Sequence, residues 1–172
     1  MDKSRVGASH NHLGQKHPAR LTIALLLATG LSSCFFFNSK DTAKRAYEAQ
    51  AKTSVGAMIR GEQAYHLENQ KFSDTIDVLG LVIQTETEEY IYEIVPQPDS
   101  AQSVYITATP KLDDLSSFSG GVFSFEVSGN KTFAIGLCQS DEASKTPPEI
   151  PTLTSTEPPQ TECPSGSKNI MR

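Results

Sequence analysis

Residues 41–69 read DTAKRAYEAQAKTSVGAMIRGEQAYHLEN, an alanine-rich stretch that ends at an asparagine. Asp41 or Thr42 is suited to cap a helix here, because a side-chain oxygen can accept hydrogen bonds from the free amides of the first turn. Apolar side chains recur at helical spacing and form one stripe: Tyr47, Ala51, Val55, Met58, Ile59 and Tyr65. Charged side chains lie opposite: Lys44, Arg45, Glu48, Lys52 and Glu62. The stretch predicts one long helix that packs by one face and ends near Asn69.

Downstream, the hydrophobic pattern changes from helical to alternating. Four β-rich stretches follow, at residues 90–95, 103–109, 122–127 and 132–137. Residues 128–131 (Ser-Gly-Asn-Lys) separate the last two and are typical of a hairpin turn. Before the strands, Ser73 is suited to cap a short helical turn, with Phe72 and Leu79 directed toward the core. Short connections favour an antiparallel meander of about four strands, whose apolar face the helix must cover, so the sequence predicts an α+β fold.

Residues 139–172 form a tail of different composition. Six of the ten prolines lie here among many Ser and Thr, and large apolar residues are few. Such a segment buries too little apolar surface to order itself. Cys138 ends the last predicted strand and Cys163 lies in the tail, so in an exported protein these two are the natural pair for a disulfide. Two free thiols are the alternative.

The N-terminal 33 residues have the pattern of an export signal. Four basic residues precede an apolar run at residues 21–31, which suits a signal peptide better than a membrane-spanning helix of about 20 residues. Leu31-Ser32-Ser33-Cys34 follows and resembles the bacterial lipobox, which implies cleavage before Cys34 and acylation, including palmitate, at that thiol. Two alternatives remain open: an uncleaved anchor over residues 21–37, and an ordinary cleaved signal with an incidental cysteine. We therefore expect a signal peptide (1–33), a tether (34–40), a globular domain (41–138) and a tail (139–172).

Composition and charge restrict the function. The whole chain carries a net charge of −5, and removal of the leader, with its four basic residues and one acid, leaves 139 residues at −8. Because nucleic-acid binding needs a basic surface, this balance argues against it. Three of the four histidines leave with the leader, so His66 alone remains. One imidazole supplies few catalytic designs, so we expect no enzyme, with His66 as a surface or capping residue and a general base as the alternative.

The order of motifs along the helix resembles a known family. Residues 49–69, then Lys71-Phe72 and residues 76–81 (IDVLGL), look like the type IV pilin-like G/H proteins abundant in cyanobacteria. Those proteins carry A-K-x-x-V-G-x-M-x-R-x-Q-Q-A-Y followed by an F and an L-G-L. The resemblance implies a pilin-like head over about residues 43–138, with residues 85–90 opening the first strand after the αβ-loop. It also implies that Cys138 and Cys163 close the C-terminal region as a disulfide.

The chain departs from the pilin pattern at its N-terminus. Pilins are cut after a Gly that precedes the apolar helix, and a Glu five residues into that helix guides assembly. Here Gly30 follows the apolar run, and no Glu lies between Leu31 and Phe37. We therefore expect a pilin-like head carried on a lipid anchor instead of a filament subunit.

Three functions remain for such a chain. The favoured one is a lipid-anchored interaction protein of the cell envelope, facing the periplasm or cell exterior, with another envelope protein as its partner. The second is a minor pilin or pseudopilin subunit of a type IV pilus or type II secretion system, and the third is an anchored solute-binding protein or enzyme. We expect no cofactor, metal or small-molecule substrate. Glu86, Glu88 and Glu89 are the candidate partner-binding residues, with Ca²⁺ binding as their alternative.

Overall fold

Helix α1 spans Ser39–Asn69 in the computed structural model, which describes residues 39–171. Its 31 residues correspond to about 46 Å at 1.5 Å per residue. The helix ends because Gln70 adopts a left-handed φ of 58° and donates its amide to the carbonyl of His66 at 2.8 Å. The predicted helix over residues 41–69 is confirmed, but Asp41 and Thr42 lie within it, so the expectation that one of them caps its start was wrong. The signal peptide and Cys34 lie outside the described residues.

An antiparallel sheet of five strands packs against α1, in the order β1-β2-β3-β4-β7. The strands are β1 (Tyr90–Val95), β2 (Ser103–Pro110), β3 (Phe118–Val127), β4 (Asn130–Ser140) and β7 (Ser167–Asn169). β1 to β4 form the predicted meander. Ser128 and Gly129 join β3 to β4 with φ of 52° and 79°, as a two-residue hairpin turn requires. The α+β prediction is confirmed, and the fifth strand comes from the tail.

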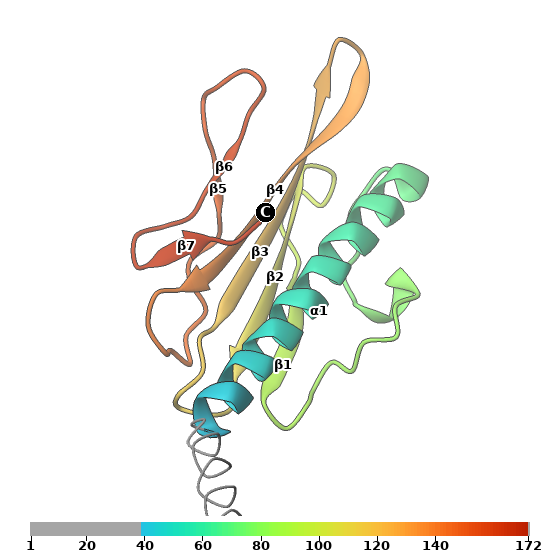
Figure 1. The fold of residues 1–172 in the computed structure, drawn as a ribbon. Coiled ribbons are helices and arrows are strands. Elements are labelled where there is room, and N and C mark those ends of the chain that lie inside the picture. Colours follow the sequence, from blue (N-terminus) through green and yellow to red (C-terminus); the bar gives the residue numbers. More distant parts are fainter. Residues whose placement is uncertain (1–38, 172) are drawn as a thin grey trace, which may run out of the picture. The chain divides into compact units, whose positions relative to one another are not determined.

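The helix lies diagonally across one face of the sheet (Figure 1). Ala51, Val55, Met58 and Ile59 are at most 1% exposed there. A Cβ built on Gly120 of β3 would lie 3.1 Å from Val55 Cγ1 and 3.2 Å from Ile59 Cδ1, so a larger residue at this position would push the helix off the sheet.

The segment between α1 and β1, residues 70–89, is called here the connecting segment. It contains one short 3₁₀ helix, η1 (Asp77–Leu79), preceded by Ile76 as its N-cap residue. Ser73 therefore does not cap this turn, and that expectation was wrong. Phe72 is buried, as predicted, and its amide donates to the carbonyl of Ser100 at 2.7 Å, which ties the segment to the loop between β1 and β2.

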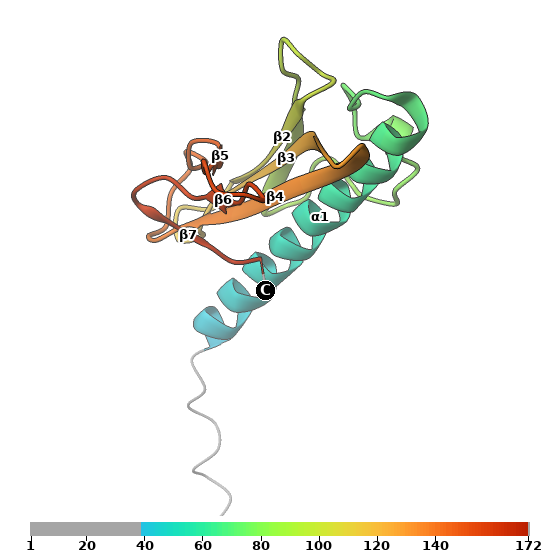
Figure 2. The ribbon, with the colours of Figure 1, turned by 90° about the horizontal axis from the view of Figure 1, so that it is seen from above.

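The tail covers the sheet face opposite α1 (Figure 2). It forms a small hairpin of β5 (Thr152–Leu153) and β6 (Thr161–Glu162) and then adds β7 beside β4. The expectation that this segment cannot order itself was wrong, because hydroxyl groups hydrogen-bond the segment to the sheet and prolines pack against it. Thr161 Oγ1 donates to the carbonyl of Ile135 at 2.7 Å, and buried Pro151 packs on the Cβ-free surface of Gly136.

Candidate functional site

The three glutamates expected to bind a partner lie at the end of the connecting segment, just before β1. The Glu86 carboxylate accepts a hydrogen bond from Lys111 Nζ at 2.9 Å, and the same ammonium donates to the carbonyl of Thr87 at 2.9 Å. Glu86 stays 63% exposed, so this is a surface ion pair. Glu88 is exposed and Glu89 is half-buried. Glu88 and most of Glu86 are thus available to a partner.

The backbone beneath these glutamates is held in place. Thr87 Oγ1 accepts hydrogen bonds from the amides of Glu89 at 3.2 Å and Tyr90 at 2.9 Å. The amide of Tyr92 donates to the carbonyl of Thr85 at 2.8 Å. Within residues 39–171, no group of three or more His, Cys, Asp or Glu is placed to hold a metal ion. The backbone of this loop is therefore restrained, while Glu86 and Glu88 remain exposed.

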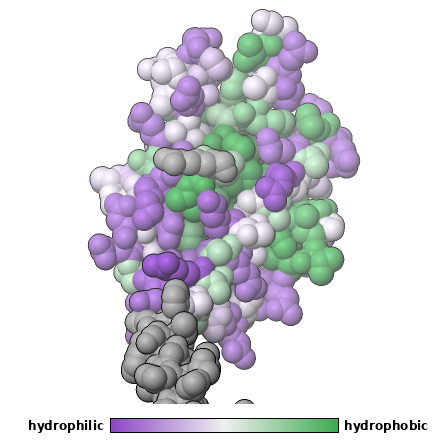
Figure 3. All heavy atoms as spheres, in the orientation of Figure 1, coloured by the Kyte–Doolittle hydropathy of each residue, from purple (hydrophilic) through white to green (hydrophobic). Residues whose placement is uncertain are grey.

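Apolar side chains are exposed on the same segment. Val78 is 55% exposed and Val82 is completely exposed, while Leu67 at the end of α1 is 56% exposed. Hydrophobic residues gather at the right-hand edge of the surface in Figure 3, over η1 and the chain that follows it. Val78, Val82, Glu86 and Glu88 are called here the loop surface. It offers apolar and acidic groups together, which is common in protein-binding surfaces.

A shallow hollow of about 330 Å³ lies between α1 and the connecting segment. Its lining residues are Gln50, Ser54, Val82, Ile83, Gln84, Thr87 and Tyr92. Tyr92 is the one titratable residue among them, and burial raises the pKa of its phenol, which therefore stays protonated at neutral pH. The lining offers no acid–base pair, so the hollow does not favour the enzyme alternative.

Two polar side chains of α1, Glu62 and His66, are fully buried. Both were expected elsewhere: Glu62 on the charged face of the helix, and His66 on the surface or at the helix cap. Those expectations were wrong. Glu62 contacts Ser73, whose amide donates to Glu62 Oε2 at 2.9 Å. The connecting segment is thereby attached to the buried face of the helix.

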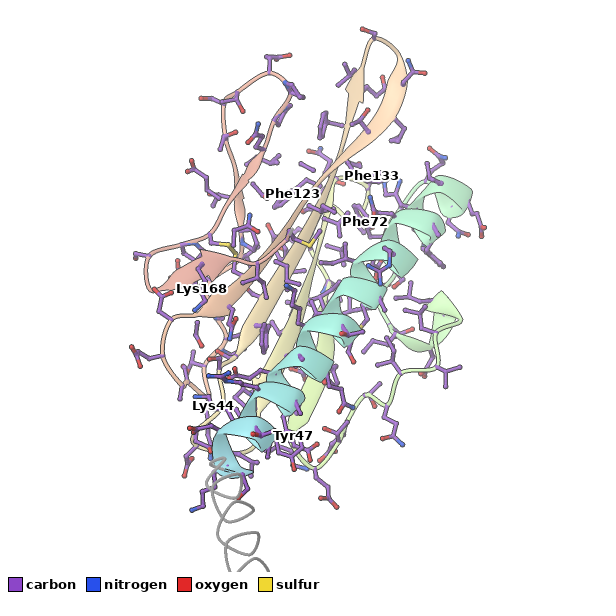
Figure 4. All side chains as sticks on the ribbon, viewed as in Figure 1. Lys44, Tyr47, Phe72, Phe123, Phe133 and Lys168 are labelled. Atoms are coloured by element: carbon purple, nitrogen blue, oxygen red, sulfur yellow. A yellow bond between two sulfur atoms is a disulfide. The ribbon has the colours of Figure 1, made fainter. Side chains whose placement is uncertain are left out.

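His66 lies in an aromatic cluster between α1 and the sheet. Its ring centroid is 4.4 Å from that of Phe72 and 5.4 Å from that of Phe133. Figure 4 shows Phe72 and Phe133 close together at one end of the sheet. Nε2 of His66 is 2.8 Å from the carbonyl oxygen of Ala101, and Nδ1 of the same ring is buried without a hydrogen-bond partner. The ring therefore joins the end of α1 to the loop before β2 and packs against two phenylalanines.

Cys138 of β4 and Cys163 form a disulfide across 25 residues, with their Cα atoms 5.6 Å apart. The bridge attaches the tail to the sheet face away from α1, close to the hairpin of β5 and β6. The predicted pairing is confirmed. It makes the tail part of the head's surface, so a partner meets a restrained segment there.

The comparison with protein families agrees with this architecture. The model of a family described as type IV pilin-like G and H, putative, matches residues 48–164. The chain belongs to the type IV pilin-like G and H family. No curated protein and no solved structure matches it. The matched region begins within α1 and ends just after Cys163, so it covers most of the helix, the meander and the disulfide.

Family membership supports a coarse function for this pilin-like head, that of a pilin-like structural protein of the cell envelope. Within residues 39–171, no helix has the length and hydropathy that a bilayer-spanning segment needs. The lipid-attachment residue expected at Cys34 lies outside the described residues, so the mode of anchoring remains a prediction.

Proposed function

We propose that this chain is a lipid-anchored, non-catalytic pilin-like protein of the cell envelope, which acts by binding another envelope protein. The anchor would be Cys34, which follows Leu31-Ser32-Ser33 and precedes the start of α1 at Ser39 by five residues. A short tether of this kind would place the head directly at the membrane surface. Two or three acyl chains hold a protein on a bilayer far better than one does.

The burial of the apolar stripe of α1 carries this proposal. The head's own sheet buries the stripe residues Ala51, Val55, Met58 and Ile59. The first turns of the helix carry the basic residues Lys40, Lys44 and Arg45. The apolar stripe of the described helix is therefore not available for packing against other helices in a filament core. A minor pilin or pseudopilin subunit is the second candidate, because the family match favours it.

The loop surface is the part of the head best suited to bind the partner. Its backbone is fixed by Thr87 and Lys111, while Glu86, Glu88 and Val82 are exposed. The helix stripe faces the core, and the tail covers part of the other sheet face. A partner with apolar groups flanked by basic side chains would match this surface. Glu89 is half-buried and contributes less.

Metabolic labelling with a palmitate analogue tests the anchor. Wild-type protein is expected to incorporate the label, and Cys34→Ser is expected to remain uncleaved and unlabelled because only a thiol forms the thioether. Cys163→Ser is the matched control, since it removes a different thiol and should keep the label. Normal labelling of Cys34→Ser would contradict the proposal. An unlabelled wild type that is cut upstream of Cys34 and carries an N-methylated terminus would support the pilus or secretion-system subunit.

A further inference from the structure

Ser73 makes three polar contacts around the buried carboxyl of Glu62. Its amide nitrogen is 2.9 Å from Glu62 Oε2. Its hydroxyl oxygen is 2.6 Å from Glu62 Oε1 and 3.0 Å from the carbonyl oxygen of Thr75. The three residues thus form a chain of close oxygen atoms between α1 and the connecting segment.

The number of protons in this chain decides its charge state. A serine hydroxyl has one proton to donate, yet both of its oxygen neighbours, a carboxylate and a carbonyl, would be acceptors if Glu62 were ionised. One of the two contacts would then join two acceptors. If Glu62 is protonated, Oε1–H donates to Ser73 Oγ, Ser73 Oγ–H donates to the Thr75 carbonyl, and Oε2 accepts the Ser73 amide. Every contact is then a donor–acceptor pair.

The surroundings of Glu62 also favour the neutral form. The side chain is fully buried, and among the described residues no cation forms an ion pair with it. On the connecting segment, the negative charge of Asp74 opposes ionisation of Glu62. His66, one turn further along α1, directs its Nε2 to the carbonyl of Ala101 instead of to the Glu62 carboxyl. Burial raises the pKa of Glu62 above its ordinary value of 4.5, and the bonds from Ser73 offset only part of this.

We propose that Glu62 is a proton-dependent lock: the protonated carboxyl holds the connecting segment on α1, and ionisation releases it. The segment carries Val78 and Val82, so the lock sets how firmly the loop surface is presented. When Glu62 ionises, the Ser73 hydroxyl can donate to only one of its two oxygen neighbours. The carboxylate is then a buried charge that no cation of the described residues pairs with, and the cost of burying that charge favours release of the segment. The inference rests on the fold alone and holds whether or not Cys34 is lipidated.

The direction of the pH effect follows from proton linkage. Between 4.5 and the raised pKa, the folded state keeps the Glu62 proton that the unfolded state has lost. The folded-to-unfolded ratio therefore falls about tenfold for each pH unit in that window. Below pH 4.5 the stabilisation is complete, and above the raised pKa it is gone.

Glu62→Gln tests the lock, because a glutamine amide donates to Ser73 Oγ as the protonated acid does but cannot ionise. The full-length protein in detergent is unfolded by urea at pH values from 4 to 8. We expect the wild type to lose stability relative to Glu62→Gln as the pH rises from 4.5, by about tenfold in the folding constant per unit. Glu68→Gln, an exposed position on the same helix, is the matched control and should show no such trend. Parallel wild-type and Glu62→Gln curves, or a wild type that gains relative stability with pH, would overturn the proposal.

A measurement on the wild type keeps the test decisive if Glu62→Gln fails to fold. The ¹³C shift of the Glu62 carboxyl, followed by NMR, is expected to titrate above 4.5. Hydrogen exchange, corrected for its intrinsic pH dependence, should show the Ser73 amide losing protection over the same window while the β2 and β3 amides keep theirs. A carboxyl that titrates at or below its ordinary value would refute the lock.

Discussion

The imidazole Nε2 of His66 lies 2.8 Å from the carbonyl oxygen of Ala101. The hydroxyl of Ser124 donates to the same oxygen at 2.7 Å, so one carbonyl uses both lone pairs to join α1 and β3 to the loop before β2. The amide of Phe72 bonds the neighbouring carbonyl of Ser100. The C-terminal end of the helix, the connecting segment and the sheet therefore meet at this loop.

Replacement of His66 by alanine should destabilise the head strongly. The change removes a fully buried ring from between Phe72 and Phe133 and leaves a cavity, which costs about 3 kcal/mol in the free energy of unfolding. His66→Phe keeps an aromatic ring, although a larger one, between the two phenylalanines and loses the hydrogen bond to Ala101, at about 1 kcal/mol. Leu67→Ala, at an exposed neighbour, should change stability by about 0.5 kcal/mol or less. Urea unfolding compares the three; equal effects of His66→Ala and Leu67→Ala would contradict this burial.

Val55→Asp should unfold the head, because it places an unpaired charge in the buried contact between α1 and β3. The contact is close: Val55 Cγ1 lies 3.1 Å from the position of a Cβ built on Gly120. Thr53→Asp introduces the same charge on the exposed face of α1 and should leave the fold intact. Circular dichroism during heating reports both outcomes. An unchanged melting transition for Val55→Asp would mean that the helix stripe is exposed.

The fold was largely predictable from local patterns. The alanine-rich stretch with its apolar stripe gave α1, and residues 128–131 gave the hairpin between β3 and β4. The order of the tail is not predictable in this way, because the tail contains few large apolar residues. Hydroxyls such as Ser117 and Ser119 hold it instead, donating to the carbonyls of Thr146 and Glu149. Such contacts depend on where the chain returns in space and leave no periodic signal.

Charge reversal on the loop surface should weaken partner binding without unfolding the head. Glu88→Lys, at an exposed residue, is expected to leave stability unchanged, whereas Glu86→Lys replaces an attraction to Lys111 by a repulsion and costs about 1 kcal/mol or less. In vivo crosslinking from a photoreactive residue at Val82 measures the yield of the crosslinked complex. Glu126→Lys on the exposed end of β3 is the control. A yield that drops equally for Glu126→Lys and Glu88→Lys would reject this surface.

Loss of the disulfide should loosen the tail more than the sheet. By the chain-entropy estimate, the bridge across 25 residues is worth about 3 kcal/mol. In the Cys138→Ser, Cys163→Ser double variant, the amide of Ile170, which donates to Leu137, should exchange faster, while the β2 and β3 amides remain protected. In protein from the envelope, both thiols should resist alkylation until reduced. Alkylation of both without reduction would show that the bridge is absent there.

The spacing of Glu62 and His66 along α1 indicates that they lie on its buried face, although their residue types are typical of an exposed face. Buried positions 51, 55, 58, 62 and 66 are separated by four, three, four and four residues, which is regular helical spacing. Because Glu and His are usually exposed, the sequence pattern predicts that the stripe continues through Tyr65 instead. The partners of the pair, Ser73 and Ala101, are set by the path of two loops, and no helix pattern specifies that path.

The central claim, a pilin-like head on a lipid anchor, is tested most directly by the intact mass of the protein extracted from membranes. We expect a chain that begins at Cys34, carries the diacylglyceryl group and an amide-linked acyl chain, and lacks two hydrogens for the Cys138–Cys163 bridge. One spectrum thus reports cleavage, lipid and disulfide together. A chain with an unmodified Cys34, either uncleaved or cut upstream to leave an N-methylated terminus, would contradict the account.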